Sequence, residues 1–530
     1  MRPSLKADGK VALVLCAIAS AGLLALAMPG RIGWWPLLFV ALAPLLRLVL
    51  YARPGRGALG GFVFGLVYNL ALLYWILIVL GRYGGLPLWI TLPALFLLAA
   101  YMACFPAVFC YLLSLLASRS QCRGRSVATL VWSAPVLWVG LDYLRSLLFS
   151  GFPWMDLGYG LFSQPVLIQA ADFGGHHLIT FSLVLCNGLV VGIVDRQSRD
   201  VRGDLRLERG LLLAALAFLG LIGGSSWFRY QEVSSIAARS MQAKVAVVQG
   251  NVDQAIKWSP ATKEATVATY LKLSQQVVRE AETELVIWPE TALPFYPQKD
   301  ALINRVFDFT TTSNAWILTG APLYTITPQA GGSDLVRYYN GAVLLGPGGR
   351  IGGQYAKQHL VPFGEYVPLR RFLPFLAPLV ESIGDFSVGA EKGPLMLGTM
   401  KLGVLICYES IFPDIAQESV ARGANLLVNV TNDAWYGRSS APYQSMAMAV
   451  FRAVENKRTL IRAANTGISG FVDPVGRITA QTEIFTEAAL AAQAPMLELT
   501  TVFNRGGYRF GTVCAALIPL LLVFRPRRKE

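Results

Sequence analysis

Residues 402–410 read LGVLICYES, an apolar run that ends in a cysteine followed by an acidic turn. Its apolar and β-branched residues predict a short buried strand over Leu402–Cys407. A cysteine where a strand gives way to a turn can present its thiol at the edge of a sheet, as a nucleophile elbow does. The alternative is a structural cysteine in the core, which is common among free thiols. No other cysteine occurs in residues 229–505, so Cys407 is the only thiol nucleophile available there.

Strand-like and helix-like stretches alternate around this run. Strands are predicted at residues 244–249, 285–288, 316–319, 342–345, 402–407 and 426–430. Helical periodicity is present over residues 262–283, 411–422 and 444–457. Alternation of this kind favours an α/β domain, or a layered α-β-β-α sandwich, for residues 229–505.

The rest of the chain is too apolar for a soluble protein. The sequence is 54% hydrophobic and 15% charged, whereas an average soluble chain is roughly 25% charged. A membrane-spanning helix needs about 20 mostly apolar residues. We therefore expect a polytopic α-helical membrane domain. Its eight candidate spans cover residues 11–28, 32–50, 58–80, 87–116, 127–149, 165–194, 209–228 and 508–524.

The basic residues indicate how these spans are oriented. The net charge is +14, and the arginines gather in alternate short loops, as Arg53 with Arg56 and Arg123 with Arg125 do. With both termini in the cytoplasm, this distribution follows the positive-inside rule. Basic residues between apolar segments, instead of on one globular face, favour contact with membrane lipids and argue against a nucleic-acid partner.

The spans divide the chain into three predicted parts. Residues 1–228 hold transmembrane helices one to seven, and residues 229–505 form an extracytoplasmic domain. Residues 506–530 hold the last helix and a basic cytoplasmic tail. A proline-rich apolar stretch, residues 369–388, is interpreted as a loop that touches the bilayer.

Metal chemistry has little support in the sequence. The chain has three histidines, no HExxH motif and no cysteine pair with zinc-ligand spacing, so no metal site is predicted. His176 and His177 lie in an apolar segment, where ionisable residues are functional candidates by default. Gly174 and Gly175 precede them and indicate a helix break or an edge of the bilayer, so a structural role is favoured for the histidines.

Two acidic residues and a lysine join Cys407 as candidates for chemistry. Glu290 ends the run LVIWPE, and a carboxylate at a strand end often faces a ligand crevice; the alternative is an exposed turn glutamate. Lys357 and Glu365 lie in YAKQHLVPFGEYVP (residues 355–368), although such a lysine is often a solvated surface residue. A thiol needs a base, and the oxyanion it creates needs a cation or N–H donors. Glu290 can supply the base, and Lys357 with the backbone N–H after Cys407 can stabilise the oxyanion.

Taken in order, the segments WPE, YAKQHLVPFGEYVP and CYE resemble the Glu–Lys–Cys pattern of the nitrilase (carbon–nitrogen hydrolase) superfamily. The resemblance continues in residues 432–443 (NDAWYGRSSAPY) and 452–465 (RAVENKRTLIRAAN). Soluble nitrilases lack membrane spans. Over nearly its whole length the chain therefore resembles the apolipoprotein N-acyltransferases, the membrane-bound branch with a nitrilase-like α-β-β-α catalytic domain.

This resemblance implies a two-step acyl transfer in the bacterial cytoplasmic (inner) membrane, with the catalytic domain in the periplasm. The implied donor is a phospholipid, and the implied acceptor is the N-terminal α-amine of a diacylglyceryl-cysteine apolipoprotein. Glu290 would be the general base, Lys357 the oxyanion partner and Cys407 the nucleophile that carries a thioester. No cofactor is expected, because the thioester itself stores the acyl energy. The supporting residues that the resemblance implies are Trp258, Glu365, Tyr408, Glu409 and Trp435.

Two alternatives share parts of this pattern. A membrane-anchored amidase of the nitrilase type would use the same three residues but has little need for eight spans. A transporter or sensor with a ligand-binding insert would fit the spans, but charges inside the apolar segments are sparse, whereas transport paths usually need them.

Overall fold

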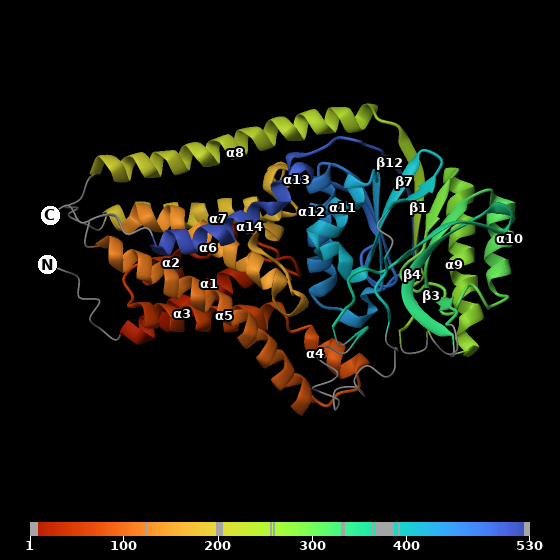
Figure 1. Cartoon of the computed structure of the whole chain (residues 1–530), viewed down its shortest axis with the longest axis horizontal. Helices are drawn as coiled ribbons and strands as arrows, with labels where there is room; N and C mark the ends of the chain where they lie inside the picture. Colours follow the sequence, from red (N-terminus) through yellow and green to blue (C-terminus); the bar gives the residue numbers. More distant parts are fainter. Residues whose placement is uncertain are drawn as a thin grey trace. The chain divides into compact units, whose positions relative to one another are not determined.

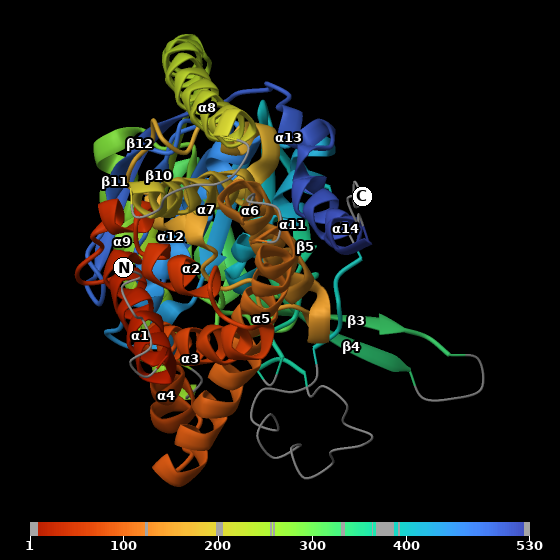
Figure 2. The same cartoon turned by 90° about the vertical axis from the view of Figure 1, so that its left-hand side faces the viewer.

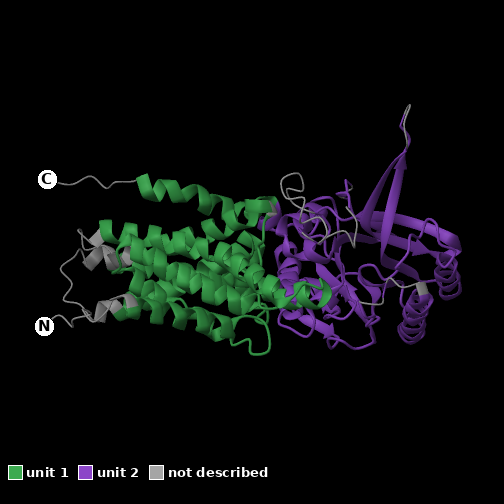
Figure 3. Ribbon diagram, turned by 90° about the horizontal axis from the view of Figure 1, so that it is seen from below, with its two compact units in different colours: residues 1–230, 505–530 green, residues 231–504 purple. Residues whose placement is uncertain are grey.

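The computed structural model describes residues 9–121, 126–197, 205–254, 257, 260–329, 334–362, 364–366, 386–390 and 393–523. The chain clusters into two compact units. One combines Met1–Tyr230 with Arg505–Glu530, and the other is Gln231–Asn504 (Figure 3). The first unit is helical, and the second contains the sheets.

The first unit is built from apolar helices. They are α1 (Gly9–Ala27), α2 (Ala43–Val49), α3 (Pro54–Leu72), α4 (Ile76–Ile78), α5 (Leu88–Gln121), α6 (Ser126–Leu147), α7 (Ala171–Gln197), α14 (Phe510–Val523) and α8 (Leu205–Arg239), whose residues after Tyr230 belong to the second unit. The segment predicted as one span over residues 32–50 is broken into a 3-10 turn at Trp35–Phe39 and α2. A proline lies in the first turn of each piece, where it can begin a helix but cannot continue one.

Within the described residues, three helices are long and apolar enough to cross a membrane, at Leu88–Arg119, Ala171–Val194 and Arg209–Arg239. Pro54–Leu72 and Ile76–Tyr83 make a fourth if this pair, bent by 55°, counts as one span. Shorter apolar helices lie at Val11–Ala27, Trp35–Val49 and Gly507–Val523. The prediction of a membrane protein with several apolar helices is confirmed, while the count of eight spans stays a prediction.

The predicted helix break at Gly174-Gly175 is confirmed, because both residues have non-helical backbone angles inside α7. The two histidines that follow are buried beside Asp156, with Nε2 of His176 2.9 Å and Nε2 of His177 3.7 Å from its Oδ2. These three residues lie near enough to one another to ligate a metal ion. Asp156 is already paired with the Arg145 guanidinium, however, so the described contacts are those of an ion-paired cluster.

The described residues of the second unit form two six-stranded mixed sheets. The first has the order β12-β1-β2-β3-β4-β5 and the second β11-β10-β9-β8-β7-β6. The strands of the first sheet are β12 (Ala488–Pro495), β1 (Gln242–Gln249), β2 (Leu285–Ile287), β3 (Trp316–Thr327), β4 (Leu335–Gly346) and β5 (Arg350–Ala356). The strands of the second are β11 (Ile478–Gln481), β10 (Gly470–Val472), β9 (Thr459–Ala464), β8 (Leu426–Thr431), β7 (Met400–Ile406) and β6 (Leu395–Leu397).

Apolar side chains from both sheets form one core between them, including Val245 and Leu318 from the first sheet and Val404 and Val428 from the second. Helices α9 (Pro260–Ala281) and α10 (Ile303–Ser313) pack on the outer face of the first sheet. Helices α11 (Pro413–Ala421) and α12 (Ala441–Asn456) lie against the second (Figure 1). The alternation of strands and helices therefore predicted an α/β domain correctly.

Strands β3 and β4 are much longer than predicted. Figure 2 shows their outer ends extending as a hairpin arm away from the sheets, with pairing that continues to Thr327 and Leu335. The predicted segments, residues 316–319 and 342–345, cover only the buried part of each strand. The arm is exposed and carries mixed polar and apolar residues. It therefore lacks the continuous apolar run that predicts a buried strand.

Candidate active site

Cys407 stands where β7 ends and a short 3-10 helix, η7 (Cys407–Ile411), begins. Its φ of +52° lies in the left-handed region, which non-glycine residues rarely adopt. Such strained residues persist where surrounding contacts hold them, and they cluster at reactive positions. The side chain keeps part of its surface accessible. The structure thus places the thiol at a strand-to-turn junction, as the sequence predicts.

A buried network surrounds Lys357 at the end of β5. Its Nζ lies 2.9 Å from Glu365 and 3.8 Å from Oε1 of Glu290. Asn340 on β4 bridges the two carboxylates, because its Nδ2 donates to Oε1 of each at 2.7 Å. The backbone N–H of Asn432, which follows β8, donates to Oε2 of Glu290 at 2.9 Å. Glu290 is therefore held by groups from both sheets.

The lysine remains a cation in this setting. Burial by itself lowers the pKa of Lys357, but the carboxylates of Glu365 and Glu290 outweigh burial and raise the pKa above its usual range. A fully buried ammonium between two carboxylates is costly to form unless its charge is balanced in this way. Lys357 is thus a permanent positive charge near Cys407, whose own charge also acts on it.

Glu409 accepts hydrogen bonds from the backbone beside Lys357 and Cys407. Its carboxylate accepts hydrogen bonds from the backbone N–H groups of Gln358 at 2.6 Å, His359 at 3.2 Å and Ile406 at 2.7 Å. The Tyr355 hydroxyl also donates to it, at 3.1 Å. Burial raises the pKa of Glu409 to about 7, against these backbone donors, which lower it. Gln358 follows Lys357, and Ile406 precedes Cys407. The Glu409 carboxylate therefore links the backbone segments that carry the lysine and the cysteine.

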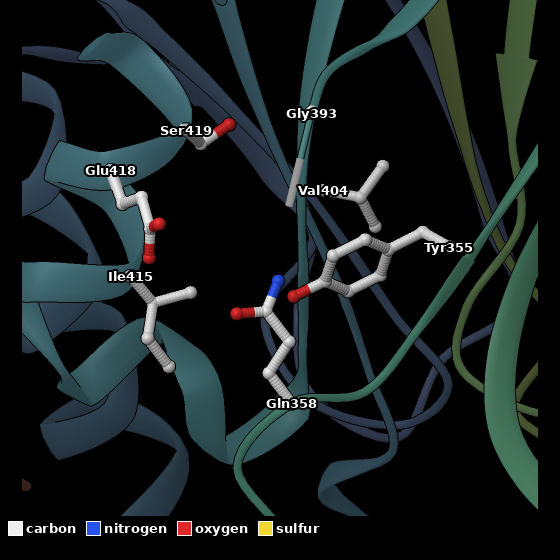
Figure 4. A pocket seen from close by; sticks show the side chains of 7 residues that line it. All are labelled: Tyr355, Gln358, Gly393, Val404, Ile415, Glu418 and Ser419. Atoms are coloured by element: carbon white, nitrogen blue, oxygen red, sulfur yellow. The ribbon is translucent and has the colours of Figure 1, made fainter. Parts of the chain in front are cut away.

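A small cavity borders this support (Figure 4). Its volume of about 10 Å³ is that of a single water molecule. The cavity is lined by Tyr355, Gln358, Gly393, Val404, Ile415, Glu418 and Ser419. Tyr355 and Gln358 also contact Glu409, so the cavity lies behind the carboxylate and not at the Cys407 thiol.

Burial raises the pKa of the Cys407 thiol to about 12. The Glu290 carboxylate adds to this increase, whereas Lys357 and a hydrogen bond with Thr431 oppose it. Asp433, in the 3-10 helix η8 (Asp433–Tyr436), also raises the value. The thiol therefore keeps its proton at neutral pH, and it becomes a nucleophile only when a base removes that proton during attack.

We expect iodoacetamide to modify Cys407 slowly at about pH 7, with a rate that increases up to at least about pH 10, because only the thiolate reacts. The measurement is mass spectrometry of the Cys407 peptide over a pH series, with glutathione as the reference thiol. A rate that levels off near about pH 8.5, the value for an ordinary cysteine, would contradict this expectation.

The structure locates most of the supporting residues predicted from the sequence. Glu365 and Glu409 contact the network directly, and Tyr408 is buried with its ring 5.1 Å from that of Phe412. Trp435 is half-buried in η8, the same turn as Asp433. Trp258 lies outside the described residues, as do residues 369–385 of the predicted bilayer-touching loop.

The sequence did not identify Asn340, Asn432 or Thr431 as members of this group. Asn340 interrupts an apolar strand, and an isolated polar residue at such a position is a signal in retrospect, because buried amides need hydrogen-bond partners. Asn432 acts through its backbone, which no side-chain pattern can reveal.

Family models match both parts of the chain. The apolipoprotein N-acyltransferase N-terminal domain matches residues 20–189, and the carbon–nitrogen hydrolase model matches residues 244–501. An apolipoprotein N-acyltransferase from Geobacter metallireducens is 40% identical over 97% of this chain and 96% of its own length. The chain belongs to the apolipoprotein N-acyltransferase family.

A second curated relative also supports membership of this family. An apolipoprotein N-acyltransferase from Methylococcus capsulatus is 33% identical over 92% of this chain and 92% of its own length. The crystal structure of Nit3 from Saccharomyces cerevisiae, a member of the nitrilase superfamily, covers 54% of this chain and 97% of its own, with 19% identity and a TM-score of 0.37. As an apolipoprotein N-acyltransferase the chain is an enzyme of lipoprotein N-acylation, which confirms the resemblance noted in the sequence.

Proposed function

We propose that this acyltransferase moves an acyl chain from a phospholipid, through a thioester on Cys407, to the N-terminal α-amine of a diacylglyceryl-cysteine lipoprotein. One observation carries the proposal. The charges of a carboxylate, Glu290, and of a buried cation, Lys357, both act on the thiol of a partly accessible cysteine at a strand end. A base and a cation beside a thiol are the requirements of acyl transfer through a covalent intermediate.

In the first half-reaction, Glu290 removes the proton from the Cys407 thiol as the sulfur attacks the ester carbonyl of the phospholipid. The carbonyl oxygen becomes negatively charged, and the Lys357 ammonium and the backbone N–H after Cys407 stabilise it. When the carbon–oxygen bond to the glycerol breaks, Glu290 returns its proton to the leaving oxygen. The products are the Cys407 thioester and a lysophospholipid.

In the second half-reaction, the neutral α-amine of the acceptor attacks the thioester carbonyl. Glu290 accepts a proton from the nitrogen, and Lys357 again stabilises the oxyanion. The carbon–sulfur bond breaks, an amide forms and the sulfur recovers a proton from Glu290. The donor product leaves before the acceptor reacts, so the two substrates follow a ping-pong order.

The remaining predicted residues have supporting roles in this proposal. Glu365 fixes the Lys357 ammonium at 2.9 Å, and Glu409 fixes the chain on either side of the site. Tyr408 and Trp435 would line the approach to the thiol, where aromatic surfaces suit acyl chains. For Trp258, the supporting role rests on the sequence resemblance alone.

The proposed topology follows the distribution of basic residues. It places eight spans in the bacterial inner membrane, both termini in the cytoplasm and residues 229–505 in the periplasm. Both substrates are lipids held in the bilayer, so spans that keep the catalytic domain at the membrane surface raise its encounter rate with them.

The test begins with the full-length protein in detergent and a phospholipid labelled in its acyl chain, without acceptor. We expect a labelled adduct on the Cys407 peptide that hydroxylamine removes, because thioesters are labile to it. Adding a diacylated lipopeptide should discharge the adduct into an N-acylated product. Mass spectrometry follows both steps.

The matched control is Cys104→Ala, which removes an exposed cysteine of the first unit and should leave the adduct unchanged. Absence of any adduct with phospholipid, together with ammonia release from simple amides, would replace this proposal with the membrane-anchored amidase. An adduct that maps to a cysteine other than Cys407 would also overturn it.

A further inference from the structure

Lys257 is a second buried lysine beside Glu290, and the chemistry proposed above does not use it. It lies in the segment after β1, and its side chain is 0% exposed. Nζ donates to the hydroxyl of Thr291 at 2.7 Å and to the backbone carbonyl of Glu290 at 3.3 Å. Among the described residues, both of its hydrogen-bond acceptors thus belong to the Glu290–Thr291 turn.

That turn is strained. Thr291 has a φ of +49°, and a β-branched residue in the left-handed region is a genuine outlier. Such a conformation costs on the order of 1–3 kcal/mol and persists only where neighbouring contacts impose it. The strand beside it, β3, makes room with a glycine, because a Cβ on Gly320 would lie 2.4 Å from the backbone nitrogen of Thr291. Gly320 therefore leaves space for the turn, and Lys257 donates hydrogen bonds to the turn.

A second route joins the same segment to the carboxylate. Asn432 donates its side-chain Nδ2 to Oε1 of Gln254 at 2.6 Å, and its backbone N–H donates to Glu290 at 2.9 Å. Gln254 and Lys257 lie three positions apart in the sequence. The segment after β1 thus holds Glu290 from both ends, by the backbone through Lys257 and by the carboxylate through Asn432.

We propose that Lys257 is a positioning residue that holds the strained Glu290–Thr291 turn, and so aims the Glu290 carboxylate at the Cys407 thiol. The inference rests on the proposed role of Glu290 as the base. Lys257 does not touch the reacting atoms, so it acts through the turn. Its charge also interacts with that of Glu290. Burial lowers the pKa of Lys257 to about 8, so at neutral pH the ammonium still carries the proton that it donates to Thr291.

The test compares Lys257→Met, Lys257→Arg and Thr291→Val in the full-length protein, by single-turnover formation of the Cys407 thioester from labelled phospholipid. We expect Lys257→Met to lower the rate constant of acylation by about 10-fold to 100-fold, because small displacements of a catalytic group have effects of this size. The phospholipid concentration at half-maximal rate should change less than about 2-fold, because Lys257 makes no substrate contact. Lys257→Arg should recover most of the rate, since it keeps the donor and the charge.

Thr291→Val removes the hydroxyl that Lys257 bonds, and keeps the β-branched shape. If the two residues act through one contact, the double variant Lys257→Met/Thr291→Val should be no slower than Lys257→Met alone. The matched control is Lys244→Met. Lys244 lies on β1 of the same unit, and its ammonium pairs with the exposed Glu282 at 2.8 Å, so the wild-type rate is expected.

Three results would overturn the inference. The first is a wild-type acylation rate in Lys257→Met. The second is a loss that follows the fraction of folded protein in a thermal scan and that arginine does not recover, since this would be a structural role only. The third is a change in the half-maximal phospholipid concentration with an unchanged maximal rate, which would make Lys257 a substrate contact. If the wild-type protein itself forms no thioester, the proposed function fails instead, so the two failures are distinguishable.

Discussion

Cys407→Ala is expected to abolish N-acylation of a diacylated lipopeptide, with a loss of at least about 10⁴-fold in the maximal rate, because removing a nucleophile eliminates the covalent route. The fold should survive the change. Alanine is smaller than cysteine and meets the same restriction at a φ of +52°, so the strain of the turn does not increase. The measurement is product formation by mass spectrometry, beside a thermal unfolding scan of the same preparation.

Cys407→Ser gives the more demanding comparison. Serine is slightly smaller than cysteine and keeps a proton for Glu290 to remove, but its hydroxyl is far less acidic and a poorer nucleophile at the same base. We expect it to be nearly as inactive as alanine. Residual N-acylation by Cys407→Ala within about 100-fold of wild type would show that the covalent route is dispensable, and the thioester would then have to be a side product.

Glu290→Gln is expected to lower the rate of thioester formation by about 10²-fold to 10⁴-fold, the usual contribution of a general base. Glutamine has the shape of glutamate and can still accept a hydrogen bond from Asn340, but it cannot take a proton from Cys407. Oε1 and Oε2 of Glu290 each accept an N–H donor, from Asn340 and from Asn432. The single oxygen of glutamine satisfies only one of them, so a modest loss of stability accompanies the loss of rate.

The control for this variant is Glu284→Gln. Glu284 is exposed and directly precedes β2, the strand that leads to Glu290, so the same chemical change there should leave acylation intact. Both half-reactions should slow in Glu290→Gln, because the same carboxylate is proposed to remove a proton in each. Slowing of the second half-reaction alone would assign the base of the first to another group.

The placement of Cys407 and Glu290 at strand ends could be predicted from sequence because apolar runs mark buried strands, and the reactive residues follow directly after them. The sequence could not predict that Lys357 contacts Glu365 and lies close to Glu290. These distances depend on how β4, β5 and the turn after β2 come together, and nothing local in YAKQHLVPFGEYVP specifies it. The roles of Asn340 and Lys257 could not be predicted for the same reason, because each residue acts through hydrogen bonds to partners that are remote in sequence.

Other parts of the fold could not be predicted because their amino-acid composition is not typical of the structure they form. Strand β12 reads AALAAQAP, and alanine is a poor indicator of a strand, so the sequence did not predict it. The segment over residues 32–50 is apolar enough for a span, but its hydropathy gives no sign that prolines divide it into two helical pieces. Apolar patterns therefore predict an element where its burial is continuous, and miss it where strand pairing or the backbone restriction of proline decides the structure.

The pairing of the first and last strands of the second unit has a consequence for biosynthesis. Strand β1 pairs with β12 along its whole length, from Gln242 opposite Pro495 to Gln249 opposite Ala488. On a growing chain, that edge of β1 has no native partner until nearly the whole unit has been translated. Contacts so remote in sequence form slowly, and the exposed strand edge invites pairing with other chains meanwhile. Chains truncated before residue 488 would expose this edge permanently, so they should be targets for quality-control proteases rather than partly active enzymes.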